Sequence, residues 1–379
     1  MSQPFSLLVK PASADCNLKC EYCFYLDTHR LYPQEATHRM SDEVLDRLIQ
    51  SYMHTDQPVY SMIWQGGEPT LMGRDFYQRV IDLQKRYGKQ GARIANSIQT
   101  NATMISPDLA AHFATYRFLA GCSLDGPPAM HDLYRRTRFD QPTQHLVLKG
   151  IHTLRSQGVA VNALVLVSQA NVHDPLQVYA YLKKQGFTFI QFVPCVEFDA
   201  QGTPLPFSIS GEEWGRFMLA IFHSWFEQDR GRISIRLFES ILSSLVWGQA
   251  GECCFGARCN HYFVVEYNGD VFPCDFFVKS EYTIGNILDL SWSQIQDSQI
   301  SHSFARLKQD WNLACETCPH QSLCMGDCLK FRQALQKGPD QLSSLCPGWK
   351  MFFDATIERF THLARSIGEH RPPTGREPG

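Results

Sequence analysis

Three cysteines near the start of the chain have the spacing of an iron–sulfur ligand set. Cys16, Cys20 and Cys23 occur in the run CNLKCEYC. A cluster of four irons needs four ligands to be closed, so three cysteines leave one iron open to hold something reactive. The spacing therefore predicts a catalytic cluster. Taken alone, this loop also allows a zinc site that is completed by a nearby histidine such as His29.

The motif Gly66, Gly67, Glu68, Pro69 follows the next predicted strand. Two glycines let the backbone approach a ligand closely, and the carboxylate can accept hydrogen bonds from a cationic amino group. The motif alone could be a simple strand-to-helix turn. Together with the cysteine loop one strand earlier, it resembles the radical S-adenosylmethionine superfamily. The resemblance implies an open [4Fe-4S] cluster that binds S-adenosylmethionine, with this motif contacting the methionyl amino group.

Polar residues also follow the third and fourth predicted strands, where a nucleoside could be held. The resemblance implies that Asn101, Ser123 and Arg135 contact the cofactor. Their alternative interpretation is as turn residues and a surface ion pair, because polar residues are common in loops. In this superfamily the reduced cluster cleaves the cofactor to a 5′-deoxyadenosyl radical, which takes a hydrogen atom from the substrate.

Nine of the fourteen cysteines fall from Cys253 onward, and their spacing resembles the SPASM extension of the same superfamily. The resemblance implies two further, fully ligated [4Fe-4S] clusters, three in all. One would be bound by Cys253, Cys259, Cys274 and Cys328, and the other by Cys315, Cys318, Cys324 and Cys346. Cys254 competes with Cys253 for its place, and two four-cysteine zinc sites are the alternative. Cys122 and Cys195 are interpreted as core thiols.

Over about residues 5–355, the order of these motifs resembles the anaerobic sulfatase-maturating enzymes. The resemblance implies oxidation of a cysteine or serine side chain in a sulfatase to Cα-formylglycine without oxygen. The radical would take hydrogen from Cβ, an auxiliary cluster would accept an electron, and Asp275 would accept a proton. Tyr25 and Gln65 match positions near the substrate, although packing and turn roles remain open for both. Asp275 could instead bond backbone amides beside the cluster.

The proton-acceptor role is limited by the ordinary pKa values of the two groups. A free aspartic acid has a pKa of about 3.9 and a free cysteine about 8.5, so proton transfer in the ground state is uphill by roughly 6 kcal/mol. Loss of a hydrogen atom from Cβ should acidify the neighbouring S–H or O–H. We therefore expect deprotonation to follow or accompany hydrogen abstraction.

The expected partners are an unfolded or nascent sulfatase segment of the type Cys/Ser-x-Pro/Ala-x-Arg and a flavodoxin- or ferredoxin-like electron donor. A competing function is that of another SPASM peptide modifier, which forms thioether or carbon–carbon crosslinks in a ribosomal peptide. A non-catalytic iron–sulfur electron carrier would explain the cysteines but not the GGEP motif.

Composition excludes several other classes of protein. The net charge is -3 and 19% of residues are charged, so no basic excess points to nucleic acid or a membrane surface. The apolar run at residues 5–9 is too short for a signal peptide, and no uncharged run could span a bilayer. We expect a cytoplasmic monomer whose cysteines bind metal rather than form disulfides.

Alternating strand and helix patterns must position these motifs. Strands are predicted at residues 6–10, 59–64, 95–100, 117–124, 159–167 and 188–194, and helices at residues 41–52, 76–87, 146–157 and 175–185. This alternation favours an α/β fold, a partial (β/α)6 TIM-like barrel, followed by a cysteine-rich SPASM domain. Residues 211–249 should be largely helical, and Asn268-Gly269 should turn a hairpin. The expected domains are residues 1–235, residues 236–365 with a closing helix, and a disordered tail at residues 366–379.

Overall fold

The computed structural model describes residues 3–25, 31–333, 338 and 340–369. His29, the candidate fourth zinc ligand, lies outside these residues. The contacts divide the chain into two compact units. Unit 1 contains Met1–Leu166, Tyr181–Phe187 and Arg258–Gln309, and unit 2 contains Val167–Ala180, Thr188–Ala257 and Asp310–Gly379. The units are therefore discontinuous in sequence.

Unit 1 is built on a mostly parallel sheet whose strand order is β10-β9-β8-β1-β2-β3-β4-β5. The strands that follow one another in the first half of the chain are β1 (Ser6–Lys10), β2 (Tyr60–Trp64), β3 (Ile94–Thr100), β4 (Leu119–Ser123) and β5 (Ala160–Val167). On its other side, β1 pairs in parallel with β8 (Tyr262–Glu266), with Lys10 opposite Glu266. The antiparallel strands β9 (Asp270–Phe272) and β10 (Gly285–Asn286) complete the sheet.

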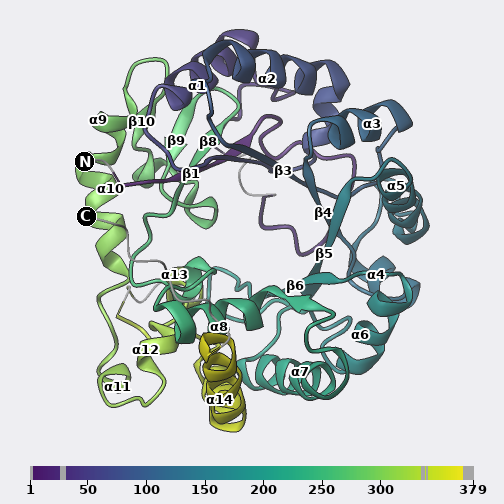
Figure 1. The fold of residues 1–379 in the computed structure, drawn as a ribbon, viewed down its shortest axis with the longest axis vertical. Coiled ribbons are helices and arrows are strands. Elements are labelled where there is room, and N and C mark those ends of the chain that lie inside the picture. The colour runs from purple at the N-terminus through teal and green to yellow at the C-terminus, as the bar shows by residue number, and fades with distance from the viewer. Residues whose placement is uncertain (1–2, 26–30, 334–337, 339, 370–379) are drawn as a thin grey trace. The chain divides into compact units, whose positions relative to one another are not determined.

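Helices connect the parallel strands and lie on the outer side of the sheet (Figure 1). They are α1 (Asp42–Met53), α2 (Gly73–Tyr87), α3 (Pro107–Thr115), α4 (Pro128–Tyr134) and α5 (Gln144–Ser156), with α9 (Trp292–Gln296) and α10 (Gln299–Leu307) further on. The Ser41 side chain caps α1 by accepting a hydrogen bond from the amide of Val44. Their apolar faces pack on fully buried strand residues such as Leu7, Val9 and Trp64.

Unit 2 contains the short parallel pair β6 (Phe189–Pro194) and β7 (Ser234–Ile235), with three long helices. These are α7 (Gly211–Ser224), α8 (Arg236–Trp247) and α14 (Cys346–Glu369). A β-carbon on Gly215 of α7 would lie 2.7 Å from the Cα of Gly348 in α14, so only glycine permits this close approach. Aromatic side chains fill the space among the three helices, including Phe222, Phe238 and Phe360.

The expected α/β class is confirmed, because all six predicted strands form and five of them pair in parallel within unit 1. The hairpin at Gly269, whose φ is 91°, joins β8 to β9 as expected. Residues 211–249 are helical except for a break between α7 and α8 that contains a π-helical turn and β7. Helix α14 extends four residues into the range expected to be a tail, and residues 370–379 lie outside the described part. The expected domain boundaries stay a prediction.

Candidate active site

The cluster loop, residues 16–23, follows β1 and is held by backbone hydrogen bonds to residues 134–137. The amide of Lys19 donates to the carbonyl of Arg136 at 2.8 Å, and the amide of Glu21 donates to that of Tyr134 at 3.1 Å. The Arg138 guanidinium donates to the carbonyl oxygen of Cys16 at 2.6 Å. These hydrogen bonds hold the loop against the segment that follows α4.

The three thiols of this loop lie within electrostatic reach of one another. Burial raises the pKa of the Cys16 thiol to about 12, and the neighbouring Cys20 contributes to the rise. Burial also raises the pKa of Cys20 to about 12, with a contribution from Cys23. A raised pKa means that forming the thiolate costs free energy. Iron would offset this cost, because a metal binds the thiolate form. The loop thus fits an iron–sulfur cluster, as its spacing predicts.

The GGEP loop, residues 66–69, packs directly on residues 13–15, which join β1 to the cluster loop. The amides of Gly67 and Glu68 donate to the carbonyls of Ser13 and Asp15 at 2.7 and 2.8 Å. A β-carbon on Gly67 would lie 2.1 Å from the Asp15 oxygen, and Gly66 has a φ of 112°. Both glycines are therefore required by backbone contact with the residues just before the cluster loop.

Glu68 is fully buried and joins the ends of β2 and β3. Its carboxylate accepts hydrogen bonds from the Thr70 and Thr100 hydroxyls at 2.6 and 2.7 Å, and from the Asn101 amide at 2.7 Å. Burial outweighs these bonds and raises the pKa of Glu68. The side chain holds the strand ends together, and its contact with a cofactor stays a prediction.

The other predicted cofactor residues lie at the same edge of the sheet. The side-chain NH2 group of Asn101 donates toward the Cys16 sulfur at 3.6 Å, and the Ser123 hydroxyl accepts from the Gln99 side chain at 3.2 Å. Arg135 is buried and donates to the Asp125 carboxylate at 2.8 Å, so it is not the surface ion pair that the alternative interpretation required. Their roles in cofactor binding stay predictions.

The three predicted catalytic and substrate residues are in direct contact. The Tyr25 hydroxyl donates to Oδ2 of Asp275 at 2.6 Å and accepts from Nε2 of Gln65 at 2.8 Å. Gln65 also donates to the same Asp275 oxygen at 3.2 Å. Burial and the Asp275 charge raise the pKa of Tyr25 well above its usual range, so the phenol remains a donor. The structure brings together residues 250 positions apart in the chain.

Two buried charged residues, Lys10 and Glu266, lie next to these three side chains, and the sequence did not indicate either of them. Nζ of Lys10 lies 2.7 Å from Oδ1 of Asp275 and 3.3 Å from Glu266, and 4.6 Å from the centre of the Tyr25 ring. Burial alone would lower the pKa of Lys10, but the two carboxylates outweigh it and hold that pKa above its usual value. Burial raises the pKa of Glu266 more than Lys10 lowers it, as expected when two carboxylates share one cation.

Four of the predicted auxiliary ligands lie close together in unit 2. The thiol of Cys324 lies within electrostatic reach of Cys315, Cys318 and Cys346, and burial raises its pKa. They come from three short segments, with Cys346 at the start of α14. The left-handed residues Met325, Gly326 and Asp327 turn the chain directly after Cys324. This grouping agrees with the expected ligand set of one auxiliary cluster.

The other expected set is divided between the units: Cys259 and Cys274 belong to unit 1, and Cys253 and Cys328 to unit 2. In unit 1, the Tyr262 hydroxyl lies 3.4 Å from the Cys274 sulfur. Within the described residues, no three His, Cys, Asp or Glu side chains converge as ligands of a single metal ion would. Cys122 and Cys195 are buried.

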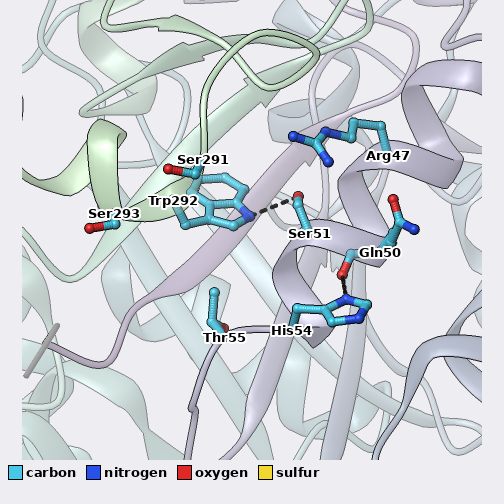
Figure 2. A pocket seen from close by; sticks show the side chains of 8 residues that line it. All are labelled: Arg47, Gln50, Ser51, His54, Thr55, Ser291, Trp292 and Ser293. Carbon is cyan, nitrogen blue, oxygen red and sulfur yellow. Dashed lines mark hydrogen bonds between the residues drawn. The ribbon is translucent and has the colours of Figure 1, made fainter.

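A surface pocket of about 430 Å³ lies elsewhere in unit 1, between α1 and the start of α9 (Figure 2). Trp292 donates to Ser51 at 3.0 Å across it, and Arg47, Gln50 and His54 also line it. None of the predicted site residues contributes to this pocket. The candidate site at the strand ends is therefore separate from this pocket.

The family of the chain follows from comparison with known proteins. Residues 11–182 match the radical SAM superfamily, and residues 253–319 match SPASM, an iron–sulfur cluster-binding domain. The strand-end site and these matches define a radical S-adenosylmethionine enzyme with a SPASM domain, which uses iron–sulfur clusters and S-adenosylmethionine. Both resemblances inferred from the motifs are thereby confirmed, and a non-catalytic electron carrier is excluded.

Similarity to individual proteins extends over nearly the whole chain. It is 34% identical to the serine-type anaerobic sulfatase-maturating enzyme of Bacteroides thetaiotaomicron, over 98% of this chain and 94% of the relative. It is 32% identical to the cysteine-type enzyme of Clostridium perfringens, over 96% of this chain and 99% of the relative. The solved structure of native anSMEcpe with bound AdoMet and Cp18Cys peptide has a TM-score of 0.90 and 32% identity, covering 96% of this chain and 100% of that one. The chain belongs to the family of anaerobic sulfatase-maturating enzymes.

Across the described ranges, no helix is long and apolar enough to cross a bilayer.

Proposed function

We propose that this protein oxidises a cysteine or serine side chain of a sulfatase to Cα-formylglycine without oxygen. The observation that carries the proposal is the contact of Asp275 with Tyr25 and Gln65, at the strand ends that also bear the cluster loop and the GGEP loop. A base, a positioning amide and an open-cluster ligand set thus occur in one compact unit. Full-length similarity to two curated maturases supports this choice over peptide crosslinking.

Cys16, Cys20 and Cys23 would hold the open [4Fe-4S] cluster. Gly66, Gly67, Glu68, Asn101, Ser123 and Arg135 would surround the bound S-adenosylmethionine. When bound, the two groups would supply the radical chemistry that removes a hydrogen atom from Cβ of the target residue. The protein must hold the target Cβ in place and keep water away. Buried Glu68 contributes by fixing the ends of β2 and β3 relative to each other.

Asp275 is the proposed proton acceptor for the target thiol or hydroxyl. Its Oδ1 is neutralised by Lys10, which leaves Oδ2 as the oxygen that faces Tyr25 and Gln65. Gln65 donates to this oxygen and to the Tyr25 hydroxyl, which uses both N–H groups of its amide and fixes the two side chains relative to each other. Two donors fix the direction of Oδ2. Because a free carboxylate is a much weaker base than a free thiolate, proton transfer is expected only once the target group has been acidified.

Two fully ligated clusters would complete the cofactor set, three [4Fe-4S] in all. The proximity of Cys315, Cys318, Cys324 and Cys346 supports the first of them. Cys253, Cys259, Cys274 and Cys328 would bind the second, with Cys254 as the competitor of Cys253. A closed cluster can accept the electron that must leave the substrate, whereas a structural zinc ion has no redox function.

The proposed substrate is an extended sulfatase segment of the type Cys/Ser-x-Pro/Ala-x-Arg in an unfolded or nascent chain. A relative of known structure binds a peptide named Cp18Cys, which supports a peptide substrate. A flavodoxin- or ferredoxin-like protein would deliver electrons to the open cluster. The enzyme would act as a cytoplasmic monomer.

The test is anaerobic turnover of the reconstituted protein with S-adenosylmethionine, a reductant and matched Cys-x-Pro-x-Arg and Ser-x-Pro-x-Arg peptides. Mass spectrometry should show conversion of at least one target residue to the aldehyde, with 5′-deoxyadenosine formed in proportion. A crosslinked peptide, or no product from any sulfatase peptide, would contradict the proposal.

A further inference from the structure

Arg135 lies beside the cluster loop, because the backbone carbonyls of its two neighbours, Tyr134 and Arg136, accept hydrogen bonds from that loop. Residues 18 and 137 form an antiparallel bridge, and the flanking amides of Lys19 and Glu21 bond the chain on either side of Arg135. These bonds bring Arg135 beside Cys20, and the charge of its guanidinium acts on the sulfurs of Cys20 and Cys23. One buried arginine thus faces two of the three open-cluster ligands.

A buried carboxylate fixes this arginine in place. Oδ2 of Asp125 accepts from Nε of Arg135 at 2.8 Å and from the hydroxyl of Tyr22, which lies between two ligand cysteines. Oδ1 of Asp125 accepts from the amide of Leu166 at 3.0 Å. The guanidinium also lies 5.4 Å from the centre of the Tyr22 ring. Asp125 and Arg135 are only 2% and 8% exposed, so bulk water does not screen their charges strongly.

We propose that Arg135 sets the reduction potential of the open cluster, and that Asp125 opposes it from the other side of the guanidinium. Reduction adds one electron, and therefore one negative charge, to the cluster and its thiolates. A fixed positive charge beside a ligand sulfur stabilises this reduced form, because the charge around a cluster helps to set its potential. The negative charge of Asp125 acts on the same Cys20 sulfur with opposite sign and smaller effect.

This inference rests on the proposed open cluster but not on the proposed substrate. It gives Arg135 a role toward the cluster in addition to the cofactor contact that the sequence predicted. The two roles are separable, because the potential can be measured without S-adenosylmethionine.

The experiment is a potentiometric titration of the anaerobically reconstituted full-length protein, followed by electron paramagnetic resonance. The signal that changes when S-adenosylmethionine is added to a separate sample identifies the open cluster. We expect Arg135→Gln to lower the ratio of reduced to oxidised open cluster at least tenfold at a fixed potential, equal to 59 mV for one electron. Asp125→Asn should raise that ratio, by a smaller factor.

The neighbouring Arg136 is the matched control. Its side chain is partly exposed and pairs with Asp140 at 3.4 Å, so Arg136→Gln should leave the potential unchanged. Shifts of the same sign in Arg135→Gln and Asp125→Asn, or an unchanged potential in Arg135→Gln with full iron content, would overturn the proposal. If Arg135→Gln fails to bind iron, the potentials of Arg135→Lys and Asp125→Asn are measured in its place. The proposal would be overturned if neither variant retained the cluster, or if Asp125→Asn retained it with an unshifted potential. Either result would show that Arg135 and Asp125 act only in cluster assembly.

Discussion

The substitution Asp275→Asn tests the proposed base with almost no change in side-chain shape. The carboxylate has three partners: Lys10 at 2.7 Å, Tyr25 at 2.6 Å and Gln65 at 3.2 Å. The amide oxygen of asparagine can still accept from Tyr25, but the NH2 group would then face Lys10. The change removes the proton acceptor and leaves a buried cation with one carboxylate, Glu266 at 3.3 Å.

The structure separates the expected loss of stability from the expected loss of activity. Removing one partner of a buried ion pair costs about 3–5 kcal/mol, but Glu266 remains, so we expect a loss of about 1–3 kcal/mol. A domain with a stability of roughly 5–15 kcal/mol survives this change. A positioned general base contributes about 10²–10⁴-fold to rate. Peptide oxidation should therefore fall by about that factor in a protein that remains folded.

The assay is a single turnover with a Cys-x-Pro-x-Arg peptide under anaerobic conditions, with aldehyde and 5′-deoxyadenosine measured in the same sample. We expect the aldehyde to fall far more than 5′-deoxyadenosine, because hydrogen abstraction does not need the base. Asp270→Asn is the matched control, since Asp270 also accepts a hydrogen bond from a tyrosine, Tyr32 at 3.1 Å. Full peptide oxidation by Asp275→Asn would refute the base assignment. Equal losses of both products would place Asp275 in an earlier step.

Three further substitutions test other contacts. Tyr25→Phe removes the hydroxyl that bonds Asp275, and since a hydrogen bond to a charged group contributes about 1.5–3 kcal/mol, aldehyde formation should fall roughly 10-fold or more. Gly67→Ala places a methyl group 2.1 Å from the Asp15 carbonyl and should lower both unfolding free energy, by about 1–3 kcal/mol, and iron content. Burial lowers the pKa of His131 to about 4, whereas the same histidine in the unfolded chain binds a proton near pH 6.5. The free energy of unfolding should therefore fall as the pH drops from 6.5 to 4. His131→Asn should remove about 3 kcal/mol of that loss, measured as the difference in unfolding free energy between variant and parent at each pH.

Each of these predictions has a contrary result. Unchanged aldehyde formation by Tyr25→Phe would remove the tyrosine from the site. Gly73 has open space around its Cα, so Gly73→Ala should retain iron, and equal iron loss from Gly73→Ala and Gly67→Ala would remove the steric argument. Identical pH dependence of parent and His131→Asn would show that the histidine titrates normally in the folded protein.

The parts of the site that could be predicted are those encoded in short segments. The cluster loop, the GGEP loop and the hairpin at Gly269 each depend on residues a few positions apart, so their spacing indicates both structure and chemistry. The six strands were recognisable for the same reason, because apolar and β-branched runs are local signals. The roles of Tyr25 and Asp275 were expected only through family resemblance, and their contact was not predicted.

The charges around Asp275 could not be predicted, because they depend on strand pairing. Lys10 ends an apolar strand, where a single lysine usually marks a surface position. Only the parallel pairing of β1 with β8 places Glu266 opposite it and buries both. Asp125 and Arg135 present the same difficulty, since nothing in HDLYRR indicates that its first arginine is buried and its second exposed at the surface. Pairing between distant segments is a property of the whole fold.

The pairing of β1 with β8 also limits how this enzyme can be divided or recombined. Strand β8 belongs by sequence to the cysteine-rich extension, yet it is the neighbour of the first strand of the α/β part. A truncation before residue 258 would leave β1 as an unpaired edge strand, and Lys10 would lose both of its carboxylate partners, Glu266 and Asp275. The extension therefore cannot be removed without opening the sheet of the α/β part. An exchange of such extensions between relatives would have to preserve the register in which Lys10 faces Glu266. The two parts of the chain would therefore have to be inherited together.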